Sequence, residues 1–286
     1  MGNQVGVRFD GRRSFLRGGN MEHQIQSIYL DTPHVEARVF DLIEPKEITQ
    51  DVAVFIIHGG GWRWGTRTLF HSIMQEFANR GYLVVSTDYR LDAKDAFVQI
   101  ADVRESYDRL ISYLKEKNRP LKVAVYGESA GAHLASMLVC TQPGQLGETC
   151  NLKNNWVNPY CGMLQATPIQ FTPWEDIQTG IWSNMQSIAG VPYEENPEPY
   201  ERLSLIEYIN ESNPRLFFLE AELEHLFASE KTRRVAQKHR QMGIATQWKI
   251  YPKAVHGFFY ELTWESPLQA MDDICLFIDG KLTTDF

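Results

Sequence analysis

The sequence lacks the features that mark metal-binding, disulfide-stabilised or membrane-spanning proteins. Its four cysteines form no CxxC pair and no zinc-ligand spacing, so we expect buried free thiols and no bound metal. No apolar run reaches the roughly 18 residues of a transmembrane helix, and the Arg-containing start has no signal-peptide core. These absences predict a cytoplasmic protein. The cysteines are Cys140, Cys150, Cys161 and Cys275.

Positive charge is also scarce. The 286 residues include 28 Lys and Arg against 36 Asp and Glu, which gives a net charge of -8. Without a basic stripe to neutralise phosphates, neither nucleic acid nor an anionic membrane is expected as the main partner. We therefore expect a small-molecule partner, and the sequence leaves the oligomeric state open.

The composition predicts one folded domain. Hydrophobic residues at 43% and charged residues at 22% are typical of globular proteins, and α/β chains of this length often form a single domain. Residues 1–20 are rich in Gly and Arg, and we expect them to be a disordered arm or an artificial leader. The domain is accordingly assigned to residues 21–286.

Apolar segments alternate between strand and helix character along the first half of the chain. Residues 52–58, 82–87 and 123–126 are continuous apolar runs, as expected of strands that are covered on both faces. Helical spacing of apolar residues lies between them, over 70–78 and 100–114. This alternation predicts an α/β fold with a mostly parallel sheet and helices on both faces.

The two ends of the domain complete this pattern. Residues 26–30 and 36–42 alternate as strands around a Thr32-Pro33 turn and predict an antiparallel hairpin. Residues 142–213 show no clean periodicity, so we expect an inserted cap there. Alternation then returns with a strand at 215–219, a helix at 229–243, a strand at 246–251 and a final helix from about 267.

A GxSxG motif follows directly on the predicted strand 123–126. Its Ser129 lies between that strand and the apolar stretch 132–139, which has the character of a helix. A sharp strand-to-helix turn exposes a serine hydroxyl for attack, and the glycines prevent collisions in the turn. The alternative is a plain Gly-rich turn, but the strand-turn-helix context favours Ser129 as a nucleophile.

A second glycine run, His58-Gly59-Gly60-Gly61-Trp62, ends the strand at 52–58. Acyl transfer develops an oxyanion, which backbone N–H groups stabilise. We therefore predict an oxyanion hole from the amides of Gly60, Gly61 and Ala130, the residue after the nucleophile. A phosphate cradle is the alternative, but the Lys-Ser/Thr pair of a P-loop is absent.

A general base must reach the serine from later in the chain. His256 follows the last predicted strand and fits the chain order of serine, acid and histidine. Three carboxylates, Glu220, Glu222 and Glu224, follow the strand 215–219. Reach into the loop favours Glu224 as the acid that orients the imidazole, with the other two left as alternatives.

Tryptophans near these motifs are candidates for substrate contact. Trp62 and Trp64 follow the glycine run, and Trp182 lies in the predicted cap, as do Trp156 and Trp174. We predict that Trp62, Trp64 and Trp182 line an acyl or alcohol pocket. The alternative is ordinary packing, because tryptophan buries a large area wherever it lies.

The motifs HGGGW, Asp88-Tyr89-Arg90-Leu91, GESAGAHLA and VHGF occur in this order, and the chain resembles esterases and lipases close to hormone-sensitive lipase. The resemblance covers about residues 51–286. Within the family, the chain is most similar to small bacterial acetyl or feruloyl esterases and to kynurenine formamidases. It implies an α/β-hydrolase fold, places Glu224 in the register of the family's acid, and implies that Asp88 anchors the glycine loop. The family's proline-rich segment after DYRL is absent.

Together these features predict a serine carboxylesterase that forms an acyl-enzyme on short-chain esters, with carbohydrate acetyl and feruloyl esters among the candidates. No cofactor is expected, because nucleophile, base and oxyanion donors all come from the chain. One alternative is an arylformamidase that hydrolyses N-formylkynurenine with the same triad. The other is a ligand-binding relative that has lost turnover, because fold alone does not fix function.

Overall fold

The computed structural model describes residues 22–31, 38–91 and 93–286. The expected arm at 1–20 and the Thr32-Pro33 turn lie outside these residues. Within them, no helix has the length and apolar character needed to cross a membrane. The cytoplasmic location stays a prediction.

The fold is built on one eight-stranded sheet with the order β1-β2-β4-β3-β5-β6-β7-β8. The pairs β1-β2 and β2-β4 are antiparallel, and every pair from β4 to β8 is parallel. The mostly parallel sheet and the N-terminal antiparallel hairpin are as predicted. The strands are β1 (Gln26–Tyr29), β2 (Val39–Ile43), β3 (Val52–Ile57), β4 (Val84–Thr87), β5 (Lys122–Glu128), β6 (Cys161–Gln165), β7 (Leu216–Ala221) and β8 (Gln247–Tyr251).

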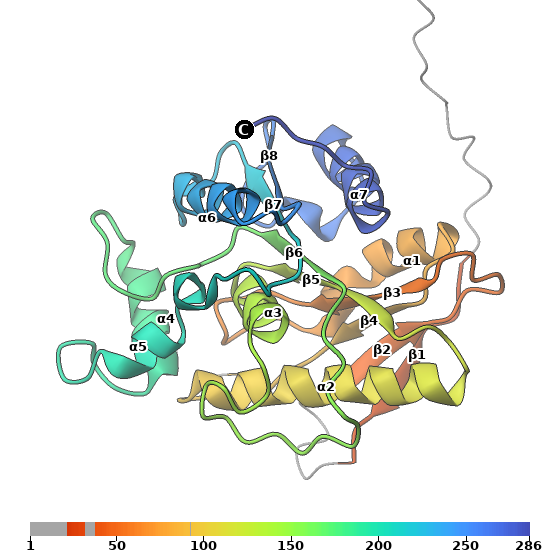
Figure 1. Cartoon of the computed structure of the whole chain (residues 1–286), viewed down its shortest axis with the longest axis horizontal. Coiled ribbons are helices and arrows are strands. Elements are labelled where there is room, and N and C mark those ends of the chain that lie inside the picture. Colours follow the sequence, from red (N-terminus) through yellow and green to blue (C-terminus); the bar gives the residue numbers. More distant parts are fainter. Residues whose placement is uncertain (1–21, 32–37, 92) are drawn as a thin grey trace, which may run out of the picture.

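Helices cover both faces of this sheet, and each face has its own hydrophobic core (Figure 1). Strand β3 contributes to both, because Phe55 joins one core while Val54 and Ile56 join the other. Helices α2, α3 and α6 supply the first core, and α1 and α7 supply the second. Their bounds are α1 (His71–Asn79), α2 (Ala96–Glu116), α3 (Ala130–Cys140), α6 (Ser229–Gln241) and α7 (Glu265–Ile278).

The predicted cap at 142–213 needs correction, because it contains a central strand of the sheet. Strand β6 pairs with β5 on one side and β7 on the other. Its sequence, Cys-Gly-Met-Leu-Gln, has no β-branched or aromatic residue, and Pro159 and Pro168 flank it, so periodicity did not reveal it. The insertion therefore begins after β6. It carries α4 (Thr179–Ala189), α5 (Glu198–Arg202) and the 3₁₀ helix η3 (Leu205–Tyr208).

This insertion lies on one side of the sheet, with α4 and α5 far from β1 (Figure 1). The other predicted strands and helices are present, with small shifts at their ends. Two further 3₁₀ helices, η2 (Arg67–Phe70) and η4 (Phe258–Tyr260), lie in loops that follow β3 and β8. Such loops follow the carboxyl ends of parallel strands, where ligands bind in α/β sheets.

Candidate active site

Ser129 lies at the sharp turn between β5 and α3. Its backbone has φ 52° and ψ -118°, a conformation that non-glycine residues rarely adopt. A Cβ on Gly127 would lie 2.2 Å from the carbonyl oxygen of Gly131, and one on Gly131 would lie 2.2 Å from that of Ile57. Both flanking glycines are therefore required for the turn. The turn presents Ser129 at the N-terminus of α3.

His256 connects Ser129 to an acid. Its Nε2 lies 3.0 Å from Ser129 Oγ, and its Nδ1 lies 2.8 Å from Glu224 Oε2. The three residues follow different parallel strands, β5, β7 and β8, and meet at the same edge of the sheet. This is the arrangement of nucleophile, base and orienting acid that acyl transfer requires.

Glu224 is the carboxylate that the fold directs at His256. Its other oxygen, Oε1, accepts hydrogen bonds from the amides of His225 at 3.0 Å and Leu226 at 2.7 Å. Burial alone would raise the pKa of Glu224, but the His256 contact and the two amides outweigh it, so the pKa is lowered. Glu224 is therefore anionic at neutral pH.

The two alternative acids, Glu220 and Glu222, form hydrogen bonds with other residues. Glu220 is 1% exposed and accepts a hydrogen bond from Thr232 Oγ1 at 2.6 Å. Burial raises its pKa to about 8, so it is largely protonated at neutral pH. Glu222 is exposed and accepts a hydrogen bond from the amide of Lys253 at 2.6 Å. Neither contacts His256 directly.

A second carboxylate, which the sequence reasoning missed, lies on the serine side of His256. Glu128 Oε1 is 3.3 Å from His256 Nε2, and the hydroxyl of Tyr260 donates to Glu128 Oε2. Burial raises the pKa of Glu128, against the opposing effects of His256 and Tyr260. The available signal was the position of Glu128 directly before the nucleophile.

The protonation of His256 reflects both carboxylates. Burial disfavours the imidazolium, but the hydrogen bond to Glu224 and the charges of Glu128 and Glu224 outweigh burial. The net effect raises the pKa of His256. The site therefore stabilises the imidazolium that forms when the base takes a proton.

The glycine run lies against the serine turn. Gly60 and Gly61 have φ values of 112° and 57°, and a Cβ on Gly60 would lie 2.2 Å from the carbonyl oxygen of Trp64. Ala130 is the first residue of α3, so its amide has no acceptor within the helix. The oxyanion role of these three amides stays a prediction.

Residues after β4 hold the glycine run in place. Tyr89 stacks on His58 with ring centroids 4.5 Å apart and donates from its hydroxyl to the His58 carbonyl at 3.1 Å. Asp88 accepts a hydrogen bond from the amide of Arg67 at 2.6 Å and lies 3.6 Å from His58 Nε2. These contacts fit the anchoring role that the family resemblance implied for Asp88.

The predicted substrate contact of Trp62 is wrong because the side chain is inaccessible. Trp62 is 1% exposed and donates from Nε1 to Nδ1 of His133 at 3.2 Å. Burial lowers the pKa of His133 to about 4, which keeps the imidazole neutral and able to accept this bond. Trp64 is 70% exposed, and Trp182 packs against Tyr200. Substrate contact by Trp64 and Trp182 stays a prediction.

A shallow pocket that is open to solvent adjoins the triad, and its enclosed part has a volume of about 10 Å³, the room of about one water molecule. One wall begins two residues after Gln165, whose carbonyl accepts a hydrogen bond from the Ser129 amide at 2.9 Å. The opposite wall includes Phe227, whose ring centroid lies 6.0 Å from that of His256. The lining residues are Thr167, Pro168, Ile169, Gln170, Trp174, Phe227, Ala228 and Lys231.

The described part of the chain contains no group of three or more His, Cys, Asp or Glu side chains placed to hold a metal ion. The triad and the neighbouring amides supply a nucleophile, a base and hydrogen-bond donors. The chemistry available from the chain itself is therefore nucleophilic acyl transfer.

Comparison with known proteins assigns the chain to a family. The model of the BD-FAE family matches residues 40–238, which is more than half of the chain. Esterase LipQ from Mycobacterium tuberculosis (strain ATCC 25618 / H37Rv) is 25% identical over 242 residues, covering 79% of this chain and 55% of LipQ. Kynurenine formamidase from Danio rerio is 25% identical over 159 residues, covering 54% of this chain and 53% of that enzyme. The chain spans about half the length of these curated relatives.

The fold itself has known counterparts. A solved structure described as a truncated form of a carbohydrate esterase from gut microbiota matches with a TM-score of 0.75 at 16% identity. The match covers 91% of this chain and 96% of that chain. The likeness shows the α/β-hydrolase fold and confirms the predicted fold class.

Proposed function

Because the chain belongs to the BD-FAE family, as its resemblance to esterases of the hormone-sensitive lipase type predicted, we propose that it is a serine carboxylesterase. Its substrates are small-molecule esters with short acyl groups. The observation that carries the proposal is the hydrogen-bonded series from Ser129 through His256 to Glu224, at 3.0 and 2.8 Å. No cofactor enters the reaction.

In the first half of the reaction, His256 Nε2 takes the proton of Ser129 Oγ as the oxygen attacks the ester carbonyl. Glu224 holds the imidazole in the required tautomer and stabilises its protonated form. The amides of Gly60, Gly61 and Ala130 bind the oxyanion. The alcohol leaves with the proton from His256, and an acyl group stays on Ser129.

In the second half, water attacks the acyl-enzyme while His256 again accepts the proton. Collapse of the second tetrahedral intermediate returns the proton to Ser129 Oγ and releases the acid. Carbohydrate acetyl and feruloyl esters remain candidates, and the carbohydrate esterase with the same fold supports testing them.

A second candidate is hydrolysis of N-formylkynurenine. The same triad would release formate from the aromatic formamide, and the similarity to a kynurenine formamidase favours including this substrate. A third candidate, a binding protein without turnover, is disfavoured by the complete triad geometry.

Hydrolysis of 4-nitrophenyl esters from acetyl to decanoyl, beside N-formylkynurenine, tests the proposal. We expect the native chain to cleave the short esters fastest and Ser129→Ala to reduce turnover by about 10⁶-fold. Ser212→Ala, at an exposed loop position, is the matched control and should keep full activity. Preference for N-formylkynurenine would move the protein to the formamidases, and no turnover of any compound would favour the binding protein.

A further inference from the structure

The open pocket beside the triad has a distinctive position. Its two walls are the segment after β6 and the segment between β7 and α6. The first wall is tied to Ser129 through the carbonyl of Gln165, and the second contacts His256 through the ring of Phe227. Each wall is therefore joined by a contact to one member of the triad.

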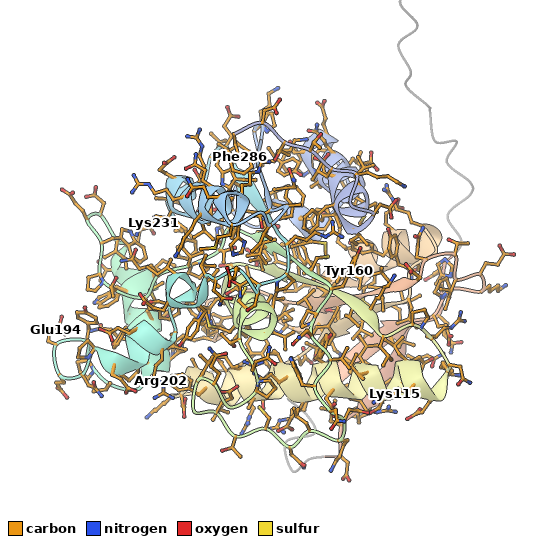
Figure 2. All side chains as sticks on the ribbon, in the orientation of Figure 1. Lys115, Tyr160, Glu194, Arg202, Lys231 and Phe286 are labelled. Carbon is orange, nitrogen blue, oxygen red and sulfur yellow. The ribbon has the colours of Figure 1, made fainter. Side chains whose placement is uncertain are left out.

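The lining of the pocket is apolar except for one charge. Trp174 and Phe227 lie with ring centroids 6.4 Å apart, and Pro168 and Ile169 complete the apolar part. Lys231 enters from the first turn of α6, on the side of the molecule where α4 lies (Figure 2). Its Nζ lies 4.4 Å from the centroid of the Trp174 ring. The pocket thus combines an aromatic wall with a single ammonium group.

This ammonium group has no carboxylate counter-ion in the part of the chain that the structure describes. Its neighbours on α6 differ, because Arg233 and Arg234 each contact Glu230 at 3.4 Å. Partial burial lowers the pKa of Lys231, with no opposing carboxylate to raise it. An anion that enters the pocket would therefore form a favourable ion pair with the Lys231 ammonium group.

A localised cation is notable in this protein because the net charge is -8. The overall field therefore repels anionic substrates, and an anion needs a local positive partner to bind near the triad. Lysine suits this role as a compact charge on a flexible stem that can follow a carboxylate. The aromatic wall would pack against the carbon skeleton that carries that carboxylate.

We infer that this pocket binds a carboxylate on the non-reacting part of the substrate, with Lys231 as its counter-ion. The inference rests on the proposed esterase function and narrows its substrate class to esters that carry a negative charge. The charge belongs either to the acyl group, as in half-esters of dicarboxylic acids, or to the alcohol, as in esters of hydroxy acids.

Two pairs of esters, matched in size, distinguish a charge on the acyl group from a charge on the alcohol. Mono(4-nitrophenyl) glutarate against 4-nitrophenyl valerate places the charge on the acyl group. 3-Acetoxybenzoate against 3-acetoxybenzamide places it on the alcohol. We expect the native chain to favour the charged member of one pair by about tenfold in kcat/KM, mainly through a lower KM.

Variants of Lys231 then test the counter-ion. Lys231→Met should remove the preference by raising KM for the charged ester much more than KM for the neutral ester, and Lys231→Arg should retain most of the preference. Lys238→Met, at an exposed position of the same helix, is the control for charge and should change neither ester.

Different results would overturn the carboxylate assignment and the esterase function. Equal rates for both members of both pairs, or a preference that survives in Lys231→Met, would overturn the carboxylate assignment while the esterase stands. Absence of Ser129-dependent turnover of the neutral esters would overturn the proposed function and this inference with it.

Discussion

A glutamate lies on each side of the His256 ring, but the two glutamates have different hydrogen-bond partners. On the Nδ1 side, Glu224 Oε2 lies 2.8 Å from His256 Nδ1, and Glu224 Oε1 accepts hydrogen bonds from two backbone amides. On the Nε2 side, Glu128 lies 3.3 Å from His256, and among the described residues its side chain accepts a hydrogen bond from the hydroxyl of Tyr260 alone. Both side chains are nearly inaccessible, at 2% and 3% exposure. Their pKa values nevertheless shift in opposite directions, downward for Glu224 and upward for Glu128.

The difference reflects what contacts each carboxylate: the hydrogen bond and charge of His256 lower the pKa of Glu224 most, and the two backbone amides add to this effect. Backbone amides favour the carboxylate form of Glu224, whereas Glu128 has fewer donors to offset its burial. We therefore expect Glu224 to orient the base and Glu128 to raise the pKa of the imidazole from the opposite side.

Glu224→Gln should have the largest effect. The amide removes the charge that stabilises the imidazolium and favours the wrong tautomer, so we expect kcat/KM for 4-nitrophenyl acetate to fall by about 10⁴-fold. Glu222→Gln, which changes an exposed carboxylate bound to the Lys253 amide, should stay within about twofold of the native value. Similar losses in both variants would remove the distinction between Glu224 and Glu222.

Gly59→Ala should disturb the packing around Glu128. A Cβ at Gly59 would lie 1.9 Å from Glu128 Oε2 and 2.8 Å from its carbonyl oxygen, so both must shift. We expect a loss of about 1–3 kcal/mol in the free energy of unfolding, measured by denaturant titration. Gly180→Ala, where nothing lies within 4 Å of the added carbon, is the control and should be neutral or slightly stabilising. Equal stability of both variants would contradict the close packing around Glu128.

Glu128→Gln should change the pH dependence more than the maximal rate. The charge of Glu128 raises the pKa of His256, so its removal should lower that pKa. Because the base must be neutral, the acidic limb of kcat/KM should move to lower pH, while the plateau falls by less than about tenfold. A profile measured from about pH 4 to pH 9 tests this. An unshifted limb would mean that Glu128 carries no charge in the resting enzyme.

The sequence predicted the triad because its information is local to motifs and strand ends. Ser129 and His256 follow from the turn glycines and the chain order, and the acid needed only a choice among three neighbouring carboxylates. The distances of 3.0 and 2.8 Å are those of the predicted arrangement, while the catalytic roles await the experiments above. Most strands were also predictable, because continuous apolar runs mark strands that are buried on both faces.

What the sequence did not predict depends on contacts between distant segments. Strand β6 has a composition unlike its neighbours, and only pairing with β5 and β7 identifies it. Trp62 stands beside the glycine run in sequence, yet His133 and Phe171 cover it in the fold. The contact of Glu128 with Tyr260 joins residues 132 positions apart, which no local pattern can show.

Tyr260→Phe should have the smallest effect, because it removes one hydrogen bond to Glu128. The Tyr260 hydroxyl lowers the pKa of Glu128, so its loss should raise that pKa and reduce the negative charge that faces His256. The acidic limb of kcat/KM should then move in the same direction as in Glu128→Gln, but by less. In the double variant, Tyr260→Phe should add no further shift, because its effect passes through the Glu128 carboxylate. Additive shifts would instead mean that Tyr260 changes the pKa of His256 without acting through Glu128. The charge of Glu128 would then not account for the difference between the two sides of the imidazole.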